Sequence, residues 1–396
     1  MQRLSQSPTD PVFVQNPYPF YDRARTGGPF FHWEDYGLTC ATSLAAVNAI
    51  LRDRRFGREV PLEMRKPVPE HLAPFYAVEA HSMLELEPPR HTRLRSLVLR
   101  AFTSRRIAAL APEIAQLSHD LIDAAPAGEF DLLRHFGQRL PVIVIARLLG
   151  VPQDMSDDLL RWSNAMVGMY MAGRSRAVED RAVAATESFV AFMRGYVEER
   201  RARPADDLIT HLIAAEAEGQ RLTTDELITT CILLLNAGHE ATVHSLGNGV
   251  KTLLETGTPP EALAPDRVAA TVEEILRFDP PLHLFTRHAY EEVEVMGHVF
   301  RRGDEVGLLL AAANRDPGAW DRPERFLPSR PEKANVAFGG GLHFCVGAPL
   351  ARLELQIALP ILFGRLAGLR LVEPPHYADV FHFHGLERLM VARRET

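Results

Sequence analysis

Residues Phe338–Gly347 read FGGGLHFCVG: three successive glycines, with Cys345 four residues after the last of them. Glycine adopts backbone angles that other residues avoid, and it lets another group approach the main chain closely. The pattern then becomes helical over about Leu350–Gly364, with a kink expected at Pro360. A cysteine at a helix N-terminus has its thiolate favoured by the helix dipole and by free backbone N–H groups. This cysteine loop (Phe338–Gly347) therefore predicts that Cys345 is a metal ligand or a nucleophile.

Other roles for the glycines and cysteines are excluded. The loop is not a phosphate-binding loop, because neither G-x-x-x-x-G-K-[ST] nor G-x-G-x-x-G is present in it. No C-x-x-C pair exists, which excludes a zinc ribbon and a thioredoxin-type site. Cys40 and Cys231 are expected to be small buried apolar residues. The three cysteines are an odd and sparse set that gives no disulfide framework, so we expect a reducing compartment, the cytoplasm.

The composition is that of an ordinary globular protein. The chain has 396 residues, of which 46% are apolar types and 24% are charged. These values exclude a disordered chain, a collagen-like fibre and a small disulfide-rich protein. The net charge of −7 argues against a broad nucleic-acid-binding surface. No stretch reaches the roughly 18 apolar residues of a membrane span, and MQRLSQSPTDPVF lacks the apolar core of a signal peptide. We expect neither nucleic acid nor a membrane as a partner, although one exposed apolar patch would still allow peripheral membrane contact.

Helical periodicity dominates the chain from Pro88 to Glu255. Strand-like segments lie toward the two ends, at Phe30–Trp33, Leu38–Thr42, Glu292–Met296, Val306–Leu310, Leu369–Val372 and Leu389–Val391. Ser43 is expected to cap a helix that ends at Arg52. No repeat or clear linker interrupts the chain, so we predict one domain over residues 1–396, mainly α with small β-sheets.

One helix is predicted to cross the whole domain. Thr223 and Glu226 form a capping box, and the helical pattern then continues to about Glu255 without proline. Roughly 32 residues correspond to about 48 Å. Ala237 and Gly238 lie in its middle, where glycine costs about 1 kcal/mol relative to alanine. Either another group approaches the backbone there, or a second helix crosses closely.

Two sets of charged residues suggest a buried site. Glu274 and Arg277 share one helix face, and Arg325 follows in the segment PERF. Exposed, such a pair contributes almost nothing, whereas buried it can brace a loop. His91 and Arg95 lie four apart on a predicted helix. Together with Arg287 and His343, these two would offer donors to two carboxylates.

The motifs EPPRHTRLR, AGHEAT, ExxR, PERF and FGGGLHFCVG occur in this order, and together they resemble the cytochrome P450 family of haem-thiolate monooxygenases, of the soluble bacterial type. The likeness runs from about residue 10 to the end. The resemblance implies a triangular, mostly helical prism with haem b between the long central helix and the helix after the cysteine loop. It also implies a reaction in which one oxygen atom of O2 is inserted into a small organic substrate.

Roles for individual residues follow from the resemblance. Cys345 would be the axial thiolate of the haem iron, and Glu274, Arg277 and Arg325 would form a buried network behind the cysteine loop. The remaining cofactor contacts would be His91, Arg95, Ala237, Gly238, Arg287, Phe338, His343 and Gly347. Electrons would come from NAD(P)H through a separate ferredoxin or flavodoxin with its reductase. That partner would dock on the cysteine side, near Arg93, Arg100 and Arg352.

Proton delivery departs from the family pattern. Glu240 occupies the family's acid position and Thr242 is the nearest hydroxyl, so these two are the catalytic candidates; a salt bridge is the other role open to Glu240. The family usually has Thr or Ser directly after the acid, where this chain has Ala241. One residue rotates a side chain by about 100° on a helix, so Thr242 does not simply replace the missing hydroxyl. We expect ordered water, or a hydroxyl on the substrate, to complete the relay.

The resemblance places the substrate pocket on four segments. Its predicted residues are His81, Met83 and Leu84; Leu233 and Asn236; Leu282, His283 and Phe285; and Phe381 and His382. Met166–Met171 is expected to form a lid. Most of these residues are apolar or aromatic, which predicts a mid-sized, mostly apolar substrate with a polar group, of terpenoid, steroid, aromatic or polyketide type.

Three other functions stay open from the sequence. A haem-thiolate peroxygenase would use hydrogen peroxide and hold a fatty-acid carboxylate with an arginine near the haem. A non-enzymatic haem sensor would tolerate the missing relay alcohol. A cysteine hydrolase would hold no haem.

Overall fold

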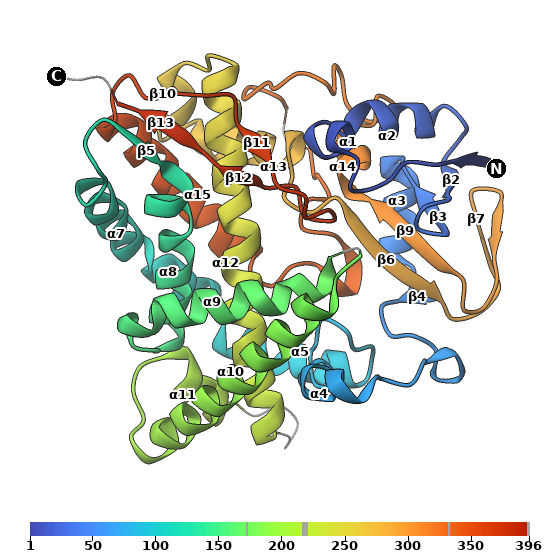
Figure 1. Cartoon of the computed structure of the whole chain (residues 1–396), viewed down its shortest axis with the longest axis horizontal. Coiled ribbons are helices and arrows are strands. Elements are labelled where there is room, and N and C mark those ends of the chain that lie inside the picture. The colour runs from blue at the N-terminus through green and yellow to red at the C-terminus, as the bar shows by residue number, and fades with distance from the viewer. Residues whose placement is uncertain (172, 216–220, 332, 394–396) are drawn as a thin grey trace.

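The structure is a computed structural model, and it describes residues 1–171, 173–215, 221–331 and 333–393. Helices make up most of it and small sheets lie at two ends (Figure 1), so the predicted class is confirmed. The helices are α1 (Pro11–Gln15), α2 (Tyr18–Arg25), α3 (Leu44–Arg52), α4 (Ala73–Glu79), α5 (Arg90–Ala101), α6 (Ser104–Ala109), α7 (Ala111–Asp123), α8 (Arg139–Leu149), α9 (Ser156–Val167), α10 (Arg176–Ala202), α11 (Leu208–Ala214), α12 (Thr224–Glu255), α13 (Val268–Phe278), α14 (Leu310–Asn314) and α15 (Ala348–Arg365). The strands are β1 (Gln2–Leu4), β2 (Phe30–Trp33), β3 (Leu38–Ala41), β4 (Phe56–Gly57), β5 (Glu129–Asp131), β6 (Leu284–Ala289), β7 (Val293–Val295), β8 (His298–Phe300), β9 (Glu305–Leu309), β10 (Arg370–Leu371), β11 (His376–Tyr377), β12 (Leu386–Arg388) and β13 (Met390–Ala392).

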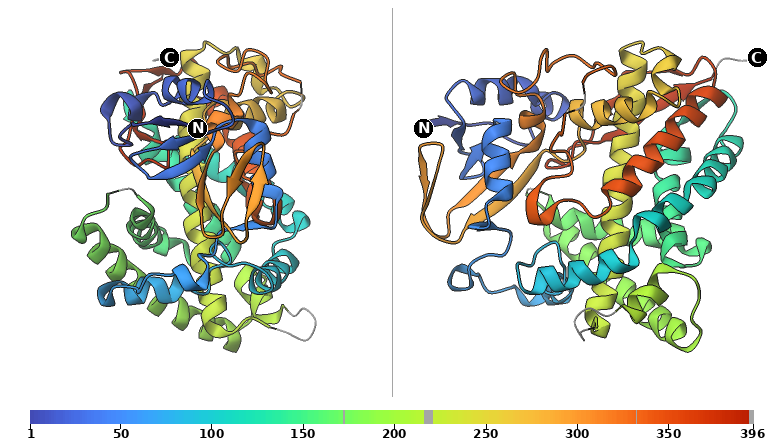
Figure 2. Two further views of the ribbon diagram at one scale, coloured as in Figure 1. Left: turned by 90° about the vertical axis from the view of Figure 1, so that its right-hand side faces the viewer. Right: turned by 180° about the vertical axis from the view of Figure 1, so that it is seen from behind.

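Helix α12 is the central element, and it runs through the middle of the molecule in every ribbon view (Figures 1 and 2). The predicted capping box of Thr223 and Glu226 is present at its start. It packs against α8, α9, α10, α13 and α15. At Gly238 a Cβ atom would lie 3.1 Å from the side chain of Ile145 in α8. The close helix crossing considered from the sequence is therefore present.

The strands form one larger sheet and three small ones. The six-stranded sheet has the order β1-β2-β3-β9-β6-β4, and in it Arg287 of β6 pairs with Val306 of β9. The sheet β10-β13-β5 joins the C-terminal strands to the middle of the chain, with Phe130 opposite Val391. Strand β5 interrupts the stretch predicted to be almost all helical. A three-residue strand has too little periodicity to be recognised in the sequence, and the strand with which it pairs lies some 260 residues away along the chain.

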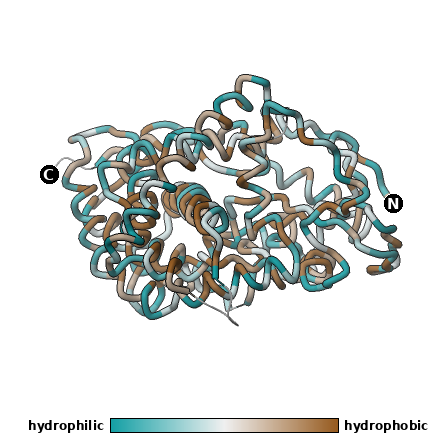
Figure 3. Tube along the Cα trace, turned by 90° about the horizontal axis from the view of Figure 1, so that it is seen from below, coloured by the Kyte–Doolittle hydropathy of each residue, from teal (hydrophilic) through white to brown (hydrophobic). Residues whose placement is uncertain are grey.

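The apolar core surrounds α12. Its largest continuous part joins the helices α4 to α13 and α15, and two smaller parts, which include α14, lie against the six-stranded sheet. In Figure 3, α12 is viewed almost along its axis, and apolar residues gather on it and on the helices beside it. Cys40 and Cys231 are buried in this core, as predicted. Among the described residues, no helix is both long enough and apolar enough to cross a membrane.

Candidate active site

One cavity of about 620 Å³ joins segments from the whole length of the chain. Its walls come from α4 and α5, from the middle of α12, from β6, from the cysteine loop and from the turn after β11. The predicted residues that line it are His91, Arg95, Ala237, Gly238, Glu240, Thr242, Arg287, Phe338, His343, Cys345 and Gly347, and from the predicted pocket Met83, Leu84, Leu233, Asn236, Leu282, Phe285 and His382. Space for an organic molecule is therefore continuous with the cysteine.

The glycines of the cysteine loop are required by its packing. Gly341 has a φ of 65°, and a Cβ atom there would lie 2.0 Å from the carbonyl oxygen of Leu51 in α3. Gly339 has a φ of 69°, which also favours glycine. The N–H of Cys345 donates to the carbonyl of Phe338 at 3.1 Å. The close approach predicted from the three glycines is confirmed, and it fixes Cys345 just before α15.

The electrostatics at Cys345 oppose one another. Burial raises the pKa of its thiol, while the N–H groups of Gly347 and Ala348 and the charges of Arg95 and Arg352 favour the thiolate. The net direction is upward. A positive charge in the cavity, such as that of a metal ion, would shift this balance toward the thiolate.

Four cationic or neutral donors face the same cavity. His91 is 1% exposed, burial lowers its pKa to about 4, and its Nδ1 has no hydrogen-bond partner. Arg287 is 3% exposed, and burial lowers its pKa to about 10. Arg95 donates to the carbonyl of Phe344 at 2.7 Å, and His343 Nε2 lies 2.9 Å from Glu87 Oε1. Among the described residues, His91, Arg95 and Arg287 have no carboxylate in contact, so these three fit a ligand that brings its own anionic groups. His343 already has Glu87 as a partner.

Behind the loop, the predicted charged network is present with one correction. Arg277 donates to both oxygens of Glu274, at 2.7 and 2.8 Å, and both side chains are buried. The second guanidinium on Glu274 belongs to Arg330, at 3.1 Å, and the prediction of Arg325 is wrong. Arg325 is exposed and contributes only its carbonyl, which accepts from Arg277 at 3.0 Å. The segment after PERF turns back toward Glu274, where the N–H of Leu327 donates to it at 2.8 Å.

Comparison with known proteins identifies the family. The model of the family described as Cytochrome P450 matches residues 268–367. The biotin biosynthesis cytochrome P450 of Bacillus subtilis is 34% identical over 401 residues, covering 98% of this chain and 99% of that protein. The chain belongs to the cytochrome P450 family. The vitamin D(3) 25-hydroxylase of Pseudonocardia autotrophica is 35% identical, covering 96% of this chain and 94% of the relative. The crystal structure of P450BioI with an acyl carrier protein ligated to hexadec-9-enoic acid superposes with a TM-score of 0.91 at 32% identity, covering 97% of this chain and all of that one.

The cytochrome P450 fold and haem b, the family's cofactor, agree with the cavity. The cavity has the size of an organic ligand site, and the unpartnered Nδ1 of His91 and the buried Arg287 suit the haem's two carboxylates. As a member of this family the chain is an oxidoreductase of the monooxygenase type. Membership overturns the haem-free cysteine hydrolase considered from the sequence.

On α12, the P450's acid position is an ion-paired carboxylate. Glu240 lines the cavity, and its two oxygens lie 3.2 Å from His239 Nε2 and 3.5 Å from His244 Nε2. Burial opposes its ionisation, but the two histidines prevail and hold the pKa of Glu240 well below its usual range. Thr242 Oγ1 donates to the carbonyl of Gly238 at 3.3 Å. No hydroxyl stands at position 241, as the sequence shows.

Three predicted pocket residues lie elsewhere, and for these the prediction is wrong. His81 is absent from the residues that line the cavity, whereas its neighbours Ser82 and Met83 are among them. Phe381 packs into an aromatic group, with ring centroids 5.3 Å from Phe13 and 5.8 Å from Trp33.

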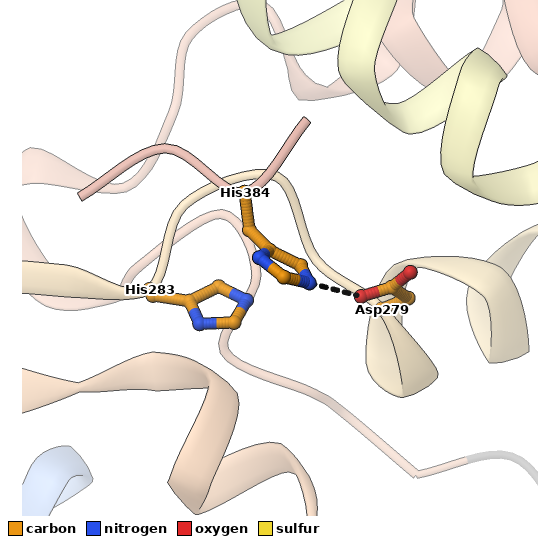
Figure 4. Close-up of side chains that lie close together, drawn as sticks. All are labelled: Asp279, His283 and His384. Atoms are coloured by element: carbon orange, nitrogen blue, oxygen red, sulfur yellow. Dashed lines mark ion pairs between the residues drawn. The ribbon is translucent and has the colours of Figure 1, made fainter. Parts of the chain in front are cut away.

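The third, His283, belongs to a buried histidine cluster of Asp279, His283 and His384 (Figure 4). His283 Nδ1 lies 2.9 Å from the hydroxyl of Tyr21, and its Nε2 has no hydrogen-bond partner. His384 Nε2 lies 3.6 Å from Asp279 Oδ1. The N–H of His283 donates to the carbonyl of His382, a cavity residue. The cluster therefore holds the segment before β6 against the C-terminal turn, and so shapes the cavity wall from behind.

The sequence analysis missed a polar part of the wall. Arg58 and Glu79 line the cavity, as does Tyr170 of the predicted lid. Arg58 forms an ion pair with Glu85, and Tyr170 donates to Glu79 at 3.0 Å. Arg58 and Glu79 lie in a proline-rich segment with no motif, so no spacing signal pointed to them.

Proposed function

We propose that the protein is a haem b monooxygenase in which Cys345 ligates the iron, formed as one domain over residues 1–396. The single observation that supports this best is the cavity in which Cys345, four buried or half-buried donors and the middle of α12 meet. When bound, a haem with a thiolate ligand supplies the activation of dioxygen. The chain's own residues then decide what is held, where protons move and which molecule is oxidised.

The cofactor contacts divide by chemistry. His91, Arg95, Arg287 and His343 would bind the two carboxylates of the haem, and Phe338, Gly347, Ala237 and Gly238 would contact its faces. The buried pair of Glu274 and Arg277, with Arg330, would keep the cysteine loop in one position. A loop held in this way positions Cys345 without movement when the ligand binds.

Proton delivery would use Glu240. Its carboxylate is ionised at neutral pH because His239 and His244 stabilise the charge, so it would accept hydrogen bonds from the water that carries the proton and would not hold the proton itself. Ala241 offers no hydroxyl to pass that proton on, so ordered water or a substrate hydroxyl completes the path, with Thr242 as the nearest side-chain hydroxyl. Ala241→Thr tests this: the fraction of electrons that ends in product should change. An unchanged fraction, for the natural substrate and for an analogue without its hydroxyl, would contradict the relay.

The substrate would be a mid-sized, mostly apolar molecule with a polar group. The apolar lining and the cavity volume support this, and the vitamin D(3) 25-hydroxylase among the relatives is named for such a substrate. Electrons would come from NAD(P)H through a ferredoxin or flavodoxin. Of the proposed docking residues, Arg100 is exposed, whereas Arg93 pairs with Glu226 and Arg352 with Glu273. Arg100 is therefore the first position to test, and Arg100→Ala should raise the KM for the electron-transfer protein.

The decisive experiment is optical titration of the purified ferric protein. Terpenoids, steroids and aromatics that displace a ligand from the iron should shift the Soret band to the blue. If long-chain fatty acids alone do so, and hydrogen peroxide replaces the electron-transfer chain, the peroxygenase alternative is favoured. A Cys345→Ala protein that keeps the same haem spectrum would contradict the assignment of the axial ligand.

A further inference from the structure

A carboxylate without an ion-pair partner stands in the wall of the substrate cavity. Glu79, the last residue of α4, lines the cavity. The hydroxyl of Tyr170 donates to its Oε2 at 3.0 Å. Within the ranges that the structure describes, no lysine, arginine or histidine lies within 4.0 Å of this carboxylate. A carboxylate so placed is stable only with a cation or a proton supplied from elsewhere.

The nearest cation is already engaged. Arg58 lines the same cavity, but its guanidinium forms an ion pair with Glu85, and its main-chain N–H donates to Glu87 at 2.8 Å. The pair of Arg58 and Glu85 is balanced, so the ionised form of Glu79 leaves one negative charge in excess at this wall. Burial, and next the charge of Glu85, raises the pKa of Glu79 to about 7.

The rest of the wall suits an organic cation. Met83, Leu84 and Leu233 are apolar and line the same cavity. Asn236 also lines it, and its Oδ1 is a buried acceptor without a donor among the described residues. The ring of Tyr170 offers a surface that attracts a cation. Acceptors are in excess on this wall, and a ligand that brings N–H donors and a positive charge satisfies them.

We propose that Glu79, oriented by Tyr170, binds a protonated amine on the substrate, so that the preferred substrates are apolar molecules carrying a basic nitrogen. The proposal rests on the monooxygenase function proposed above and names its substrate class. A charge-assisted hydrogen bond forms between the ammonium group and the carboxylate. Fatty acids are disfavoured, because their carboxylate meets a like charge.

The test is a Soret titration of the ferric holoenzyme with three ten-carbon probes: N,N-dimethyldecylamine, 1-decanol and decanoate. The amine should give a blue shift and bind about tenfold more tightly than decanol, and decanoate should bind most weakly. Glu79→Gln keeps the size and the acceptor for Tyr170 but removes the charge. It should weaken amine binding about tenfold or more and leave decanol binding within about twofold. Glu70→Gln, at an exposed glutamate just before α4, is the matched control and should change neither.

The pH dependence gives an independent readout. The amine stays protonated from pH 6 to 8, while Glu79 loses its proton near pH 7, so amine affinity should rise with pH across this range. Of the other groups facing Glu79, Arg58 stays charged and paired with Glu85, and Tyr170 stays neutral because burial raises its pKa. His382 stays neutral because burial lowers its pKa to about 4. Glu79→Gln should abolish the rise.

The results that would contradict the amine proposal can be distinguished from those that would contradict the proposed function. Equal affinity for amine and decanol would overturn the proposal. So would a Glu79→Gln protein that loses affinity for both alike, since Glu79 would then serve only to hold Tyr170 against α4. A red shift with the amine would place its nitrogen on the iron and would also overturn it. Tyr170→Phe should weaken amine binding only a few-fold, and the variant should still bind the amine more tightly than decanol. If no probe shifts the Soret band, or the protein carries no haem spectrum, the proposed function itself has failed.

Discussion

Two buried clusters of ionisable residues lie at the C-terminal end of α13, and they are stabilised in opposite ways. Before its end, Glu274 faces two guanidiniums and a backbone N–H, so each charge has an opposite charge in contact. Just after its end, Asp279 accepts from the hydroxyls of Tyr18 and Tyr377, and the histidines beside it are neutral, since burial lowers the pKa of each. The side chains of the first cluster are held in one arrangement by their ion pairs. The second is held in place by hydrogen bonds and by two uncharged histidines, and it is therefore the one that acid should disturb.

The largest effect is expected from Arg277→Ala. Glu274 would lose its bidentate partner, and three carbonyls, those of Asn314, Pro323 and Arg325, would lose their donor. Breaking a buried pair by removing one partner costs about 3–5 kcal/mol. The urea concentration at the midpoint of unfolding and the haem content per protein should both fall. A variant with normal haem content would mean that the cysteine loop does not depend on this cluster.

A smaller loss is expected from Arg330→Ala. Glu274 keeps Arg277, so the carboxylate stays paired, but the contacts of Arg330 with its two oxygens, at 3.1 and 3.3 Å, are lost. Hydrogen bonds from Arg330 to the carbonyls of Asp321, Arg322 and Arg325 are lost as well. The free energy of unfolding should fall by about 1.5–3 kcal/mol, as measured by urea midpoint. A loss as large as that of Arg277→Ala would show that the two arginines act as one unit, which the double variant would confirm by non-additivity.

The histidine cluster predicts a pH effect. In the unfolded chain, His283 takes up a proton as pH falls through about 6.5, whereas in the folded protein burial holds its pKa well below that value. Stability should therefore be complete above pH 6.5 and fall below it, by about 1.4 kcal/mol per pH unit for each such histidine. His283→Phe should reduce this slope by one proton, measured by urea unfolding between pH 7 and pH 5.5. His376→Phe, at an exposed histidine of β11, should leave it unchanged.

The smallest effect is expected from Arg325→Ala. Its side chain is exposed, and the carbonyl that Arg277 uses is kept in the variant. The free energy of unfolding should change by less than about 0.5 kcal/mol. A loss comparable to that of Arg330→Ala would restore the role that the sequence suggested for Arg325.

The two clusters also show what a sequence can predict. Glu274 and Arg277 lie three apart on one helix, so their contact follows from helix geometry alone. The cysteine loop, the capping box and the long helix were predictable for the same reason, since each is a local pattern. The histidine cluster and its tyrosine partners lie at positions 21, 279, 283, 377 and 384, and no local sequence spacing predicts their contact.

The errors have the same cause. Arg325 and Arg330 lie in one short irregular segment, and the turn of its backbone decides which side chain reaches Glu274. The family pattern places His283 in the pocket with Leu282 and Phe285, but only the backbone path shows that its side chain points to Tyr21. Glu79 lies in a segment without periodicity, so its place in the cavity was not visible before the fold was known.

The attachment of the cavity wall to Tyr21 and Tyr18 has a consequence for protein engineering. The C-terminal turn that carries His382 into the cavity is tied, through His384 and Asp279, to tyrosines of α2 near the start of the chain. Exchange of that turn between related enzymes would transplant half of a unit whose other half lies more than 350 residues earlier. A chimaera that also carries α2 should accept the new turn, and one that carries the turn alone should lose the shape of the donor's pocket.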